Sequence, residues 1–428
     1  MKKACAFVLT VVTLFVLTAC GQNTADEKGR VYWLNFKPEL DKTAQELAKI
    51  YTEKTGVPVK VVTAASGTYS QTLLAEMDKS SPPTMFVIGN QAGVKDWKDY
   101  ALDLKGTAIA NELATDAYNL YDETGKLVAI GYCYECYGII VNPDLIKKAG
   151  HGMDKLKNFA GLKTVAEDIH ARAKELGFDA FSASDMDASS SWRFTGHMAN
   201  LEYFHEKREA GNAWTECPAK LTGNYMDNYK NLFDLSINNS TVKPNTLASG
   251  GHDPENEFKT GKAAFFINGS WEYRAVSETV PNATMIPYYS GVPGEEKAGL
   301  NCGTENHWAV NSNVKEADRK ATIDFMVWLV SDPEASAAMV KELGIIPYKK
   351  APASSNGFLN DAAKYTAAGH YVMDWAANCQ PNVNEYRSGL VAALNRYCAD
   401  QSDANWEAVR AAFVDGWASQ YTKINTVR

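Results

Sequence analysis

The stretch K-A-A-F-F-I-N-G-S-W-E-Y-R, residues 262–274, joins a short apolar run to a group of turn and polar residues. Residues 263–267 have the length and composition of a buried strand. Residues 268–270, Asn-Gly-Ser, favour the end of that strand and the start of a helix. We therefore expect Trp271 and Glu272 at the end of a rigid element, beside free backbone N–H groups.

Trp271 is a candidate ligand contact because of this position. In an open α/β sheet, ligands bind beyond the carboxyl ends of the strands. A flat indole beside hydrogen-bonding groups suits a sugar ring, which has apolar faces and a polar rim. The alternative is an ordinary core or rim tryptophan, and the stretch alone leaves both open.

The first residues have the pattern of an export signal. Two lysines, Lys2 and Lys3, precede an apolar run over residues 4–17 that is too short to span a membrane. The run ends in Leu-Thr-Ala-Cys, which resembles the bacterial lipobox. That resemblance implies a signal peptide over residues 1–19, cleavage before Cys20, diacylglycerol on its sulfur and acylation of the new amino terminus. A plain secretory peptide with a chance cysteine is the alternative.

The rest of the chain reads as a globular body tied to a membrane surface. Residues 20–30 are small and polar, as in a flexible tether, and no later stretch is apolar enough to cross a bilayer. Removal of residues 1–19 takes two lysines and no acid, so the formal charge of −8 becomes −10. This balance argues against nucleic-acid binding, for which a basic stripe would be expected. The length favours two or three domains, and 47 aromatic residues, from 10 Trp, 21 Tyr and 16 Phe, can furnish both a core and a site.

Six cysteines remain after Cys5 leaves with the signal and Cys20 takes lipid. They are Cys133, Cys136, Cys217, Cys302, Cys379 and Cys398. An even number in an exported chain permits disulfides, and six cysteines allow fifteen connectivities. The C-x-x-C of residues 133–136 runs into a strand-like segment, whereas the redox motif opens a helix. No paired ligand set for zinc accompanies it, so we expect neither a metal nor a cofactor.

The first part of the body predicts a β-α-β unit. Residues 31–34 read as a strand, residues 39–55 as a helix that stops at Gly56, and residues 57–62 as a second strand parallel to the first. A third strand follows at residues 84–88. Further helices are expected near 94–104 and 108–120, before a hairpin turn.

Polar residues follow several of these strands. Residues 65–69, Ala-Ser-Gly-Thr-Tyr, open a helix whose free N–H groups bind either the Ser and Thr side chains or a ligand. Asn90 follows the third strand. Glu135 interrupts two apolar runs and is expected to face a cleft, because its burial without a partner would be unfavourable. In a loop after another strand, Trp192 and Arg193 are interpreted as a platform and a polar clamp, with a solvated loop as the alternative.

Collinear motifs resemble those of the extracellular solute-binding proteins of carbohydrate ABC importers. The segments that carry the resemblance, besides the lipobox, are W-L-N-F-K-P-E (33–39), A-S-G-T-Y (65–69), Y-G-I-I-V-N-P-D-L (137–145), F-K-T-G-K-A-A-F-F-I-N-G-S-W (258–271) and N-W-E-A-V-x-x-A-F-V-D-G-W (405–417). Trp271 matches the family's sugar-stacking tryptophan, and Glu135 matches a hydrogen-bonding carboxylate at the hinge. Cys133, Cys136 and residues 303–308 depart from the general family pattern.

The resemblance implies an α/β fold of the periplasmic-binding-protein type II, with two lobes joined by a hinge and a ligand cleft between them. We expect lobe 1 to comprise residues 31–140 and 309–346, and lobe 2 to comprise residues 141–308 and 347–428. The candidate ligand-binding residues are Trp33, Asn35, Phe36, Lys37, Glu39, Ser66, Gly67, Thr68, Tyr69, Asn90, Glu135, Trp192, Arg193, Trp271, Glu272, Glu305 and Trp375.

The expected function is capture of a sugar and its delivery to the membrane permease of an ABC importer, by a monomer held on the outer face of the cytoplasmic membrane. No G-x-S-x-G, H-E-x-x-H, Walker or G-x-G-x-x-G motif occurs, so no catalytic residue is assigned. Two alternatives stay open. One is a surface glycoside hydrolase, whose two carboxylates need no fixed spacing. The other is a peptide-binding receptor on the same fold.

Overall fold

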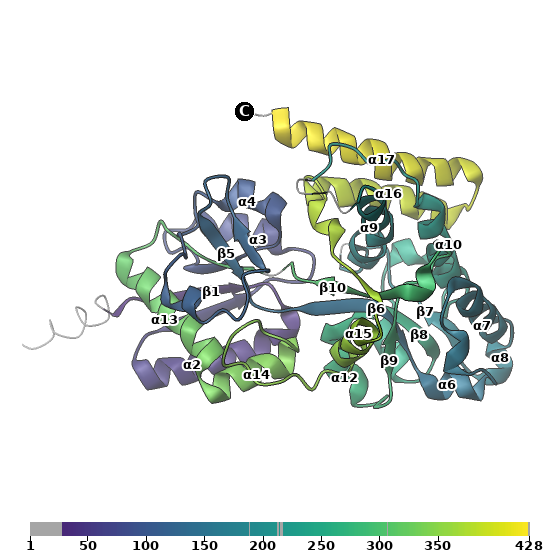
Figure 1. Ribbon diagram of the computed structural model, residues 1–428, viewed down its shortest axis with the longest axis horizontal. Helices are drawn as coiled ribbons and strands as arrows, with labels where there is room; N and C mark the ends of the chain where they lie inside the picture. Colours follow the sequence, from purple (N-terminus) through teal and green to yellow (C-terminus); the bar gives the residue numbers. More distant parts are fainter. Residues whose placement is uncertain (1–27, 188, 212–213, 215–216, 306, 427–428) are drawn as a thin grey trace, which may run out of the picture.

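Two β-sheets, each with helices packed on both faces, form two lobes that lie side by side (Figure 1). The structure, a computed structural model, describes residues 28–187, 189–211, 214, 217–305 and 307–426. The predicted signal peptide and the predicted lipid site at Cys20 lie outside the described residues. The two-lobe α/β architecture agrees with the predicted fold class.

The sheet of lobe 1 has the strand order β2-β1-β3-β11-β5-β4. Its strands are β1 (Val31–Asn35), β2 (Val59–Thr63), β3 (Met85–Ile88), β4 (Asn119–Tyr121), β5 (Leu127–Gly131) and β11 (His307–Val310). The predicted parallel pairing of the first two strands is confirmed, and β3 is also parallel to β1. β11 returns from lobe 2 and runs antiparallel between β3 and β5.

The helices of lobe 1 follow the apolar periodicity only in part. They are α2 (Asp41–Thr55), α3 (Tyr69–Met77), α4 (Gln91–Trp97), α5 (Ala108–Asn111), α13 (Glu316–Ser331) and α14 (Pro333–Leu343). α2 follows a 3-10 turn, η1 (Pro38–Leu40), and ends as predicted at Gly56, whose φ of 72° suits glycine. The expected helices over 94–104 and 108–120 are wrong in extent. α4 ends at Trp97 and α5 at Asn111, and residues 119–121 form an edge strand beside β5.

The sheet of lobe 2 has the order β12-β10-β6-β8-β7, and β9 pairs with the far half of β6. Its strands are β6 (Glu135–Val141), β7 (Asp179–Ser182), β8 (Ala263–Gly269), β9 (Thr284–Ile286), β10 (Ala298–Gly303) and β12 (Tyr371–Met373). All seven residues of β8 are buried, so the predicted buried strand is confirmed.

Helices surround this second sheet, and α16 and α17 pack together along one side of lobe 2 (Figure 1). The α-helices are α6 (Pro143–Lys148), α7 (Phe159–Ala171), α8 (Ala173–Leu176), α9 (Asn200–Glu209), α10 (Met226–Asn238), α11 (Pro254–Lys259), α12 (Tyr273–Ser277), α15 (Gly357–Ala367), α16 (Val383–Ala399) and α17 (Asp403–Thr426). The short turns and the π-helical segment are η2 (Met153–Lys155), η3 (Arg193–Met198), η4 (Pro244–Ser249), η5 (Ser270–Glu272), η6 (Glu295–Lys297) and η7 (Ala376–Cys379).

One disulfide joins distant parts of lobe 2. Cys217 is bonded to Cys379 at the end of η7. The sequence permits disulfides but leaves their connectivity open, and this bond is one of the possible pairs. It fits a chain that folds in an oxidising compartment.

The described ranges show three crossings between the lobes, and the predicted boundaries need correction. The first crossing is the segment between β5 and β6, so the boundary after residue 140 falls inside a strand of lobe 2. The second lies between β10 and β11, so the boundary after residue 308 falls inside a strand of lobe 1. The third runs from α14 to α15, and Tyr348 still bridges to Leu113 of lobe 1, beyond the boundary after residue 346. β6 and β11 belong to the lobe whose strands they pair with, and the predicted boundaries cut through both strands.

Each lobe has its own apolar core, and a smaller third cluster lies beneath β6, β8 and β10 against α15. Two cores joined by short crossings permit movement of the lobes as units. Within the described ranges, no helix has the apolar length needed to span a bilayer.

Candidate ligand-binding site

Three strand ends of lobe 2 meet at the edge of the sheet that faces lobe 1. β8 ends at Gly269 opposite Tyr137, and β10 ends at Gly303 opposite Glu135, the first residue of β6. Because directly opposed residues of antiparallel strands lie side by side, these positions form one edge. Side chains that follow the strand ends are thereby brought close together.

Two glycines at this edge let indole rings pack against the backbone. A Cβ on Gly269 would lie 2.1 Å from the ring of Trp271. A Cβ on Gly303 would lie 2.9 Å from the ring of Trp375. Both separations are shorter than a van der Waals contact, so only glycine accepts an indole in these places. The Asn-Gly-Ser of the predicted turn thus has a second role besides ending the strand.

An aromatic cluster lines the edge, made of Tyr137, Trp192, His197, Trp271 and Trp375. The rings of Trp192 and Trp271 are 5.9 Å apart, and His197 lies 5.3 Å from Trp271. His197 stacks on Tyr137 at 4.1 Å, and Tyr137 lies 5.2 Å from Trp375. Such offset and tilted pairs are favourable packing geometries, and they fix the orientation of the ring faces.

The start of η3 supplies a cation, Arg193, and the residue just before η3, Trp192, supplies an indole. The Arg193 guanidinium lies 4.1 Å over the ring of Trp192, and its Nη2 is 4.0 Å from Oε1 of Glu272. Burial lowers the pKa of Arg193, against the effect of Glu272. Burial and then the charge of Glu255 raise the pKa of Glu272 to about 7, although Arg193 opposes them. The Nδ2 of Asn268 donates to Glu272 at 2.8 Å.

A buried ion pair joins the lobes at the hinge. The Nζ of Lys37, which follows β1, donates to Oε1 of Glu135 at 2.6 Å and lies 3.2 Å from Glu39. Burial opposes the charge on Lys37, but Glu135 and Glu39 raise its pKa well above the ordinary value. The same ammonium is 5.8 Å from the centroid of Trp271. Lobe 1 therefore places a cation beside the aromatic cluster.

A second polar contact lies at the second crossing. The Nε2 of His197 is 3.9 Å from Oε1 of Glu305. Burial would raise the pKa of Glu305, but the hydrogen bond with His197 and the charge of Arg387 lower it to about 2. Burial lowers the pKa of His197 despite this carboxylate. At neutral pH the site thus holds a charged carboxylate beside a neutral imidazole.

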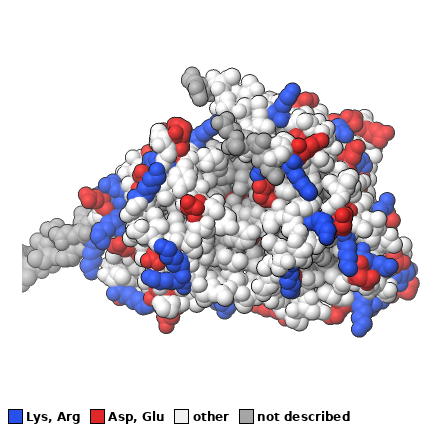
Figure 2. All heavy atoms as spheres, viewed as in Figure 1, with Lys and Arg blue, Asp and Glu red and all other residues white. Residues whose placement is uncertain are grey.

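The predicted site residues divide into those that these contacts join and those that they do not. The joined residues are Lys37, Glu39, Glu135, Trp192, Arg193, Trp271, Glu272, Glu305 and Trp375. Each contacts another member of the set, or reaches one through His197. The surface between the lobes is hollowed, and acidic side chains are visible in the hollow (Figure 2).

Trp33 does not belong to this site. Its side chain is 0% exposed and packs in the core of lobe 1 against Trp308 and Phe325. The prediction of Trp33 as a ligand-binding residue is therefore wrong. Asn35 is also fully buried, where its Nδ2 donates to the carbonyl of Lys37 at 2.7 Å. Asn35 holds the backbone of Lys37 and offers no group to a ligand.

The loop that opens α3 is mostly occupied with local contacts. Tyr69 is buried, donating to the carbonyl of Leu34 and accepting from the N–H of Val87, and Phe36 packs on its ring. Thr68 donates to the carbonyl of Ala65 and does not cap the helix.

Three further candidates lie on the side of lobe 1. The exposed Ser66 contacts lobe 2, through the carbonyl of Ser189 at 3.4 Å, and Gly67 next to it has a φ of 75°. Asn90 caps α4 by accepting from Gly93 N–H. Ser66 is therefore the candidate of this group with a hydrogen bond to a described residue of lobe 2.

Sequence reasoning missed Tyr137, His197 and Arg387. Tyr137 looked like one more residue of an apolar strand, and His197 lies in a π-helical segment that no motif signals. Arg387 comes from α16, where its Nε donates to Gln380, and its guanidinium lies so close to Gly196 that a Cβ there would be 2.8 Å away. The pair Gly196-His197, separated by two residues from Trp192-Arg193, is the one signal that could have indicated a close approach.

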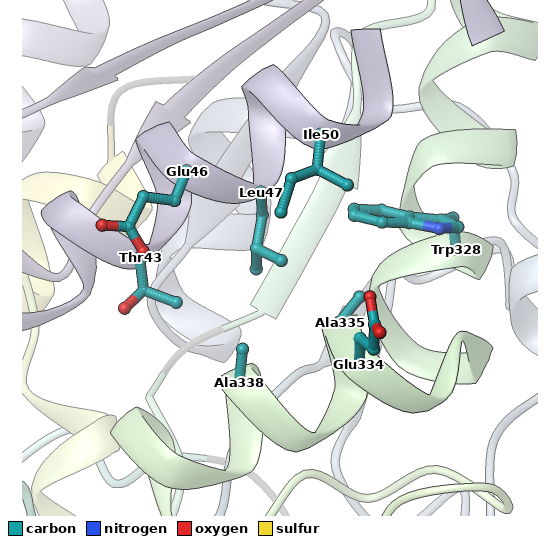
Figure 3. A pocket seen from close by; sticks show the side chains of 8 residues that line it. All are labelled: Thr43, Glu46, Leu47, Ile50, Trp328, Glu334, Ala335 and Ala338. Atoms are coloured by element: carbon teal, nitrogen blue, oxygen red, sulfur yellow. The ribbon is translucent and has the colours of Figure 1, made fainter. Parts of the chain in front are cut away.

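A separate small pocket lies on lobe 1, between α2 and the helices α13 and α14 (Figure 3). Its volume is about 110 Å³, and it is lined by Thr43, Glu46, Leu47, Ile50, Trp328, Glu334, Ala335 and Ala338. Pockets for drug-sized ligands are several times larger. No residue of the aromatic cluster contributes to it. Throughout the described part of the chain, no group of three or more His, Cys, Asp or Glu side chains is arranged to hold a metal ion.

The fold and the cleft define a two-lobed binding protein of the periplasmic-binding-protein type II. Residues 46–371 match the family described as bacterial extracellular solute-binding protein, and the chain belongs to that family. Its members are binding proteins and not enzymes, so the hydrolase alternative is set aside. No curated protein matches the chain in sequence.

Solved structures with the same fold cover almost the whole chain. A family 1 extracellular solute-binding protein from Bifidobacterium longum subsp. infantis is 19% identical with a TM-score of 0.62, covering 91% of this chain and all of that one. The solute-binding protein RafE, in complex with raffinose, is 18% identical with a TM-score of 0.69 over 90% and 98%. A chitin oligosaccharide binding protein is 16% identical with a TM-score of 0.70 over 92% and 100%.

Proposed function

We propose that this protein captures a sugar, specifically an oligosaccharide, in the cleft between its lobes and delivers it to the permease of an ABC importer. The observation that carries the proposal is the position of Trp271. Its indole follows a buried strand end and lies within 6 Å of Trp192, His197 and the ammonium of Lys37. Ring faces beside charged hydrogen-bonding groups suit a ligand with apolar faces and a hydroxyl rim.

Buried polar atoms in the same region support a ligand rich in hydroxyls. Arg193 Nε, Trp375 Nε1 and the Tyr288 hydroxyl are buried and have no hydrogen-bond partner among the described residues. Tyr288 lies 5.8 Å from Tyr137 of the aromatic cluster. Buried polar atoms usually find partners, and a sugar hydroxyl both donates and accepts.

Contacts between the lobes support closure around the ligand. Lys37 and Glu135 pair across the hinge, and Arg274 of α12 pairs with Glu342 of α14 at the rim. A ligand that contacts both lobes stabilises the closed arrangement over the open one. Closure then buries the sugar against the aromatic cluster and distinguishes loaded from empty protein for the permease.

The cellular setting in this proposal follows from the sequence. The signal and lipobox indicate a protein anchored through lipid on Cys20 to the outer face of the cytoplasmic membrane. A monomer tethered in this way diffuses in two dimensions next to the permease subunits, and the ATPase is a separate cytoplasmic chain. The raffinose and chitin-oligosaccharide proteins of the same fold agree with an oligosaccharide as cargo.

A panel of mono- and oligosaccharides and of short peptides tests the proposal. Isothermal titration calorimetry is combined with tryptophan fluorescence and with chromatography of the incubated ligand. We expect heat and a fluorescence change for at least one oligosaccharide, with the ligand recovered intact. Binding of peptides alone, or cleavage of a glycosidic bond, would contradict the proposal.

Lipidation is tested separately. In the producing cell, a labelled fatty acid should be incorporated into the protein and lost in Cys20→Ala. A protein that carries no label and is released in soluble form would contradict the anchor, and would leave the sugar proposal unaffected.

A further inference from the structure

Two buried cysteines face each other across the strands that lead to the hinge. Cys136 of β6 and Cys302 of β10 are directly opposed in the antiparallel register, with exposed fractions of 0% and 5%. Directly opposed residues have Cα atoms about 4.5–5.5 Å apart and side chains on the same face. A disulfide requires Cα atoms about 4.4–6.8 Å apart. The backbone therefore already has the spacing that a cross-strand disulfide needs.

The two thiols are also in contact. Contact with the Cys136 thiol lowers the pKa of Cys302, whereas burial raises the pKa of Cys136. Both side chains belong to the small apolar cluster against α15, where Met285 and Phe358 also pack. The alternation of β6 directs Glu135 and Tyr137 to the opposite face, that of the aromatic cluster.

The other reduced cysteines lie elsewhere. Cys133 packs in the core of lobe 1, and Cys398 packs in the main core of lobe 2. Cys133 lies in the first crossing between the lobes, and its side chain belongs to a different cluster from that of Cys136. Among the described residues, Cys136 and Cys302 are thus the reduced pair that shares one cluster and one register position.

We propose that Cys136 and Cys302 form a second disulfide bond in the exported protein. The two thiols lose two protons and two electrons, one S–S bond forms, and the electrons reduce the disulfide of an extracytoplasmic dithiol–disulfide oxidant through a mixed disulfide. The bond between Cys217 and Cys379 indicates that the chain folds where such an oxidant acts.

Burial determines when the bond forms. Neither thiol of the folded protein is open to a protein oxidant, since Cys136 is fully covered and Cys302 nearly so. Oxidation therefore accompanies folding, when β6 and β10 come together and before α15 closes over the cluster. Once formed, the bond is shielded from reductants in the same way.

The bond would lie next to the ligand cleft, on the strands that follow the first crossing and precede the second. Glu135, the partner of Lys37, is paired with Gly303 at the next register position, and the ring of Trp375 packs on that glycine. A covalent link at the neighbouring position holds these two strand ends in one spacing while the lobes move. The proposal concerns the protein itself and does not depend on which ligand binds.

Peptide mapping of the exported protein tests the bond directly. The protein is denatured in iodoacetamide without reductant, digested, and analysed by mass spectrometry before and after reduction. We expect one peptide pair that joins Cys136 to Cys302, a second that joins Cys217 to Cys379, and alkylated Cys133 and Cys398. Alkylated Cys136 and Cys302, or a link from either of them to Cys133, would overturn the proposal.

Thermal unfolding gives an independent test. In a variant that lacks the other bond, Cys217→Ser with Cys379→Ser, a reductant can act only on the proposed one. A cross-link that closes a loop of this length stabilises substantially, so dithiothreitol should lower the unfolding midpoint by roughly 5 °C or more. Adding Cys136→Ser and Cys302→Ser should abolish the response, and adding Cys398→Ser instead should preserve it. An equal or absent response in all three proteins would overturn the proposal, and mapping of the wild type remains decisive if a variant does not fold.

Discussion

Trp33 and Trp271 each lie in or beside a buried strand of one lobe, but they differ in exposure. Trp33 is fully buried, and Trp271 is partly exposed. Trp33 is the third residue of β1, a strand whose five residues are all buried. Trp271 is the second residue after β8, in the turn η5, and stays partly exposed. Both belong to motifs that resemble sugar-binding segments. A tryptophan inside a strand of this sheet is covered from both faces, whereas one just past the strand end projects from the edge.

The two lobes also contribute different side chains to the cleft. Lobe 2 supplies the aromatic rings, because three of its strand ends meet there and two of them carry glycine. Lobe 1 supplies Lys37 and Glu39, which follow β1 after Asn35 has turned the chain. Lobe 2 thus supplies the rings together with Arg193 and Glu272, whereas the contribution of lobe 1 is charged and has no ring of the aromatic cluster.

Trp33→Ala is expected to have the largest effect, on stability. Removal of a fully buried indole in contact with Trp308 and Phe325 should cost about 3–5 kcal/mol of unfolding free energy. The affinity of the folded fraction for its sugar should be unchanged. Denaturant unfolding followed by calorimetric titration of the folded protein measures both. A large loss of affinity with little loss of stability would contradict the assignment of Trp33 to the core and would indicate that it contacts the ligand.

Trp271→Ala should have the reverse pattern. We expect a loss of about 2 kcal/mol or more in binding free energy, or roughly thirtyfold in Kd, with a small change in the unfolding midpoint. Isothermal titration calorimetry measures the affinity. Trp328→Ala is the matched control, because that indole lies in the separate pocket of lobe 1 and should leave affinity unchanged. Unaltered binding in Trp271→Ala would remove this residue from the site.

The fold could be predicted from local pattern to a considerable extent. The buried run of β8, the parallel pair β1 and β2, and the stop of α2 at Gly56 all follow from periodicity and turn chemistry. The lobe boundaries could not be predicted from local pattern, because β6 and β11 are assigned to a lobe by the strands that they pair with. Pairing between residues far apart in sequence leaves no local signal.

Candidate site residues could be predicted where they follow a strand end, as for Trp271 and Glu135, or where a motif carries the family resemblance, as for Lys37. The structure brings these three side chains together. His197 was missed, because nothing in the sequence indicates a π-helical segment or the stack on Tyr137. Arg387 was missed because α16 reaches the cleft through tertiary packing alone. Trp33 was wrongly included, because the motif that contains it does not show whether a residue lies inside a strand or at its end.

The smallest expected effect is a dependence of stability on pH that arises from Glu272, beside Trp271. Burial and Glu255 raise the pKa of Glu272 from 4.5 to about 7 in the folded protein, while Arg193 and Asn268 oppose the shift. Between these values the unfolded chain has released the proton and the folded protein keeps it. The folded state therefore binds more protons, and its stability should fall as the pH rises from 4.5 to 7 and then level off.

Glu272→Gln isolates this contribution, because Glu202, with a pKa raised to about 10 by burial, also favours the folded state at low pH in both proteins. The difference in unfolding free energy between wild type and variant should change by on the order of 1–2 kcal/mol between pH 4.5 and pH 6. Denaturant titrations across this range measure it. Glu278→Gln, at an exposed position just after α12, is the control. A difference that grows in the opposite direction would mean that Arg193 outweighs burial, and that the carboxylate beside the indole is charged at all working pH values.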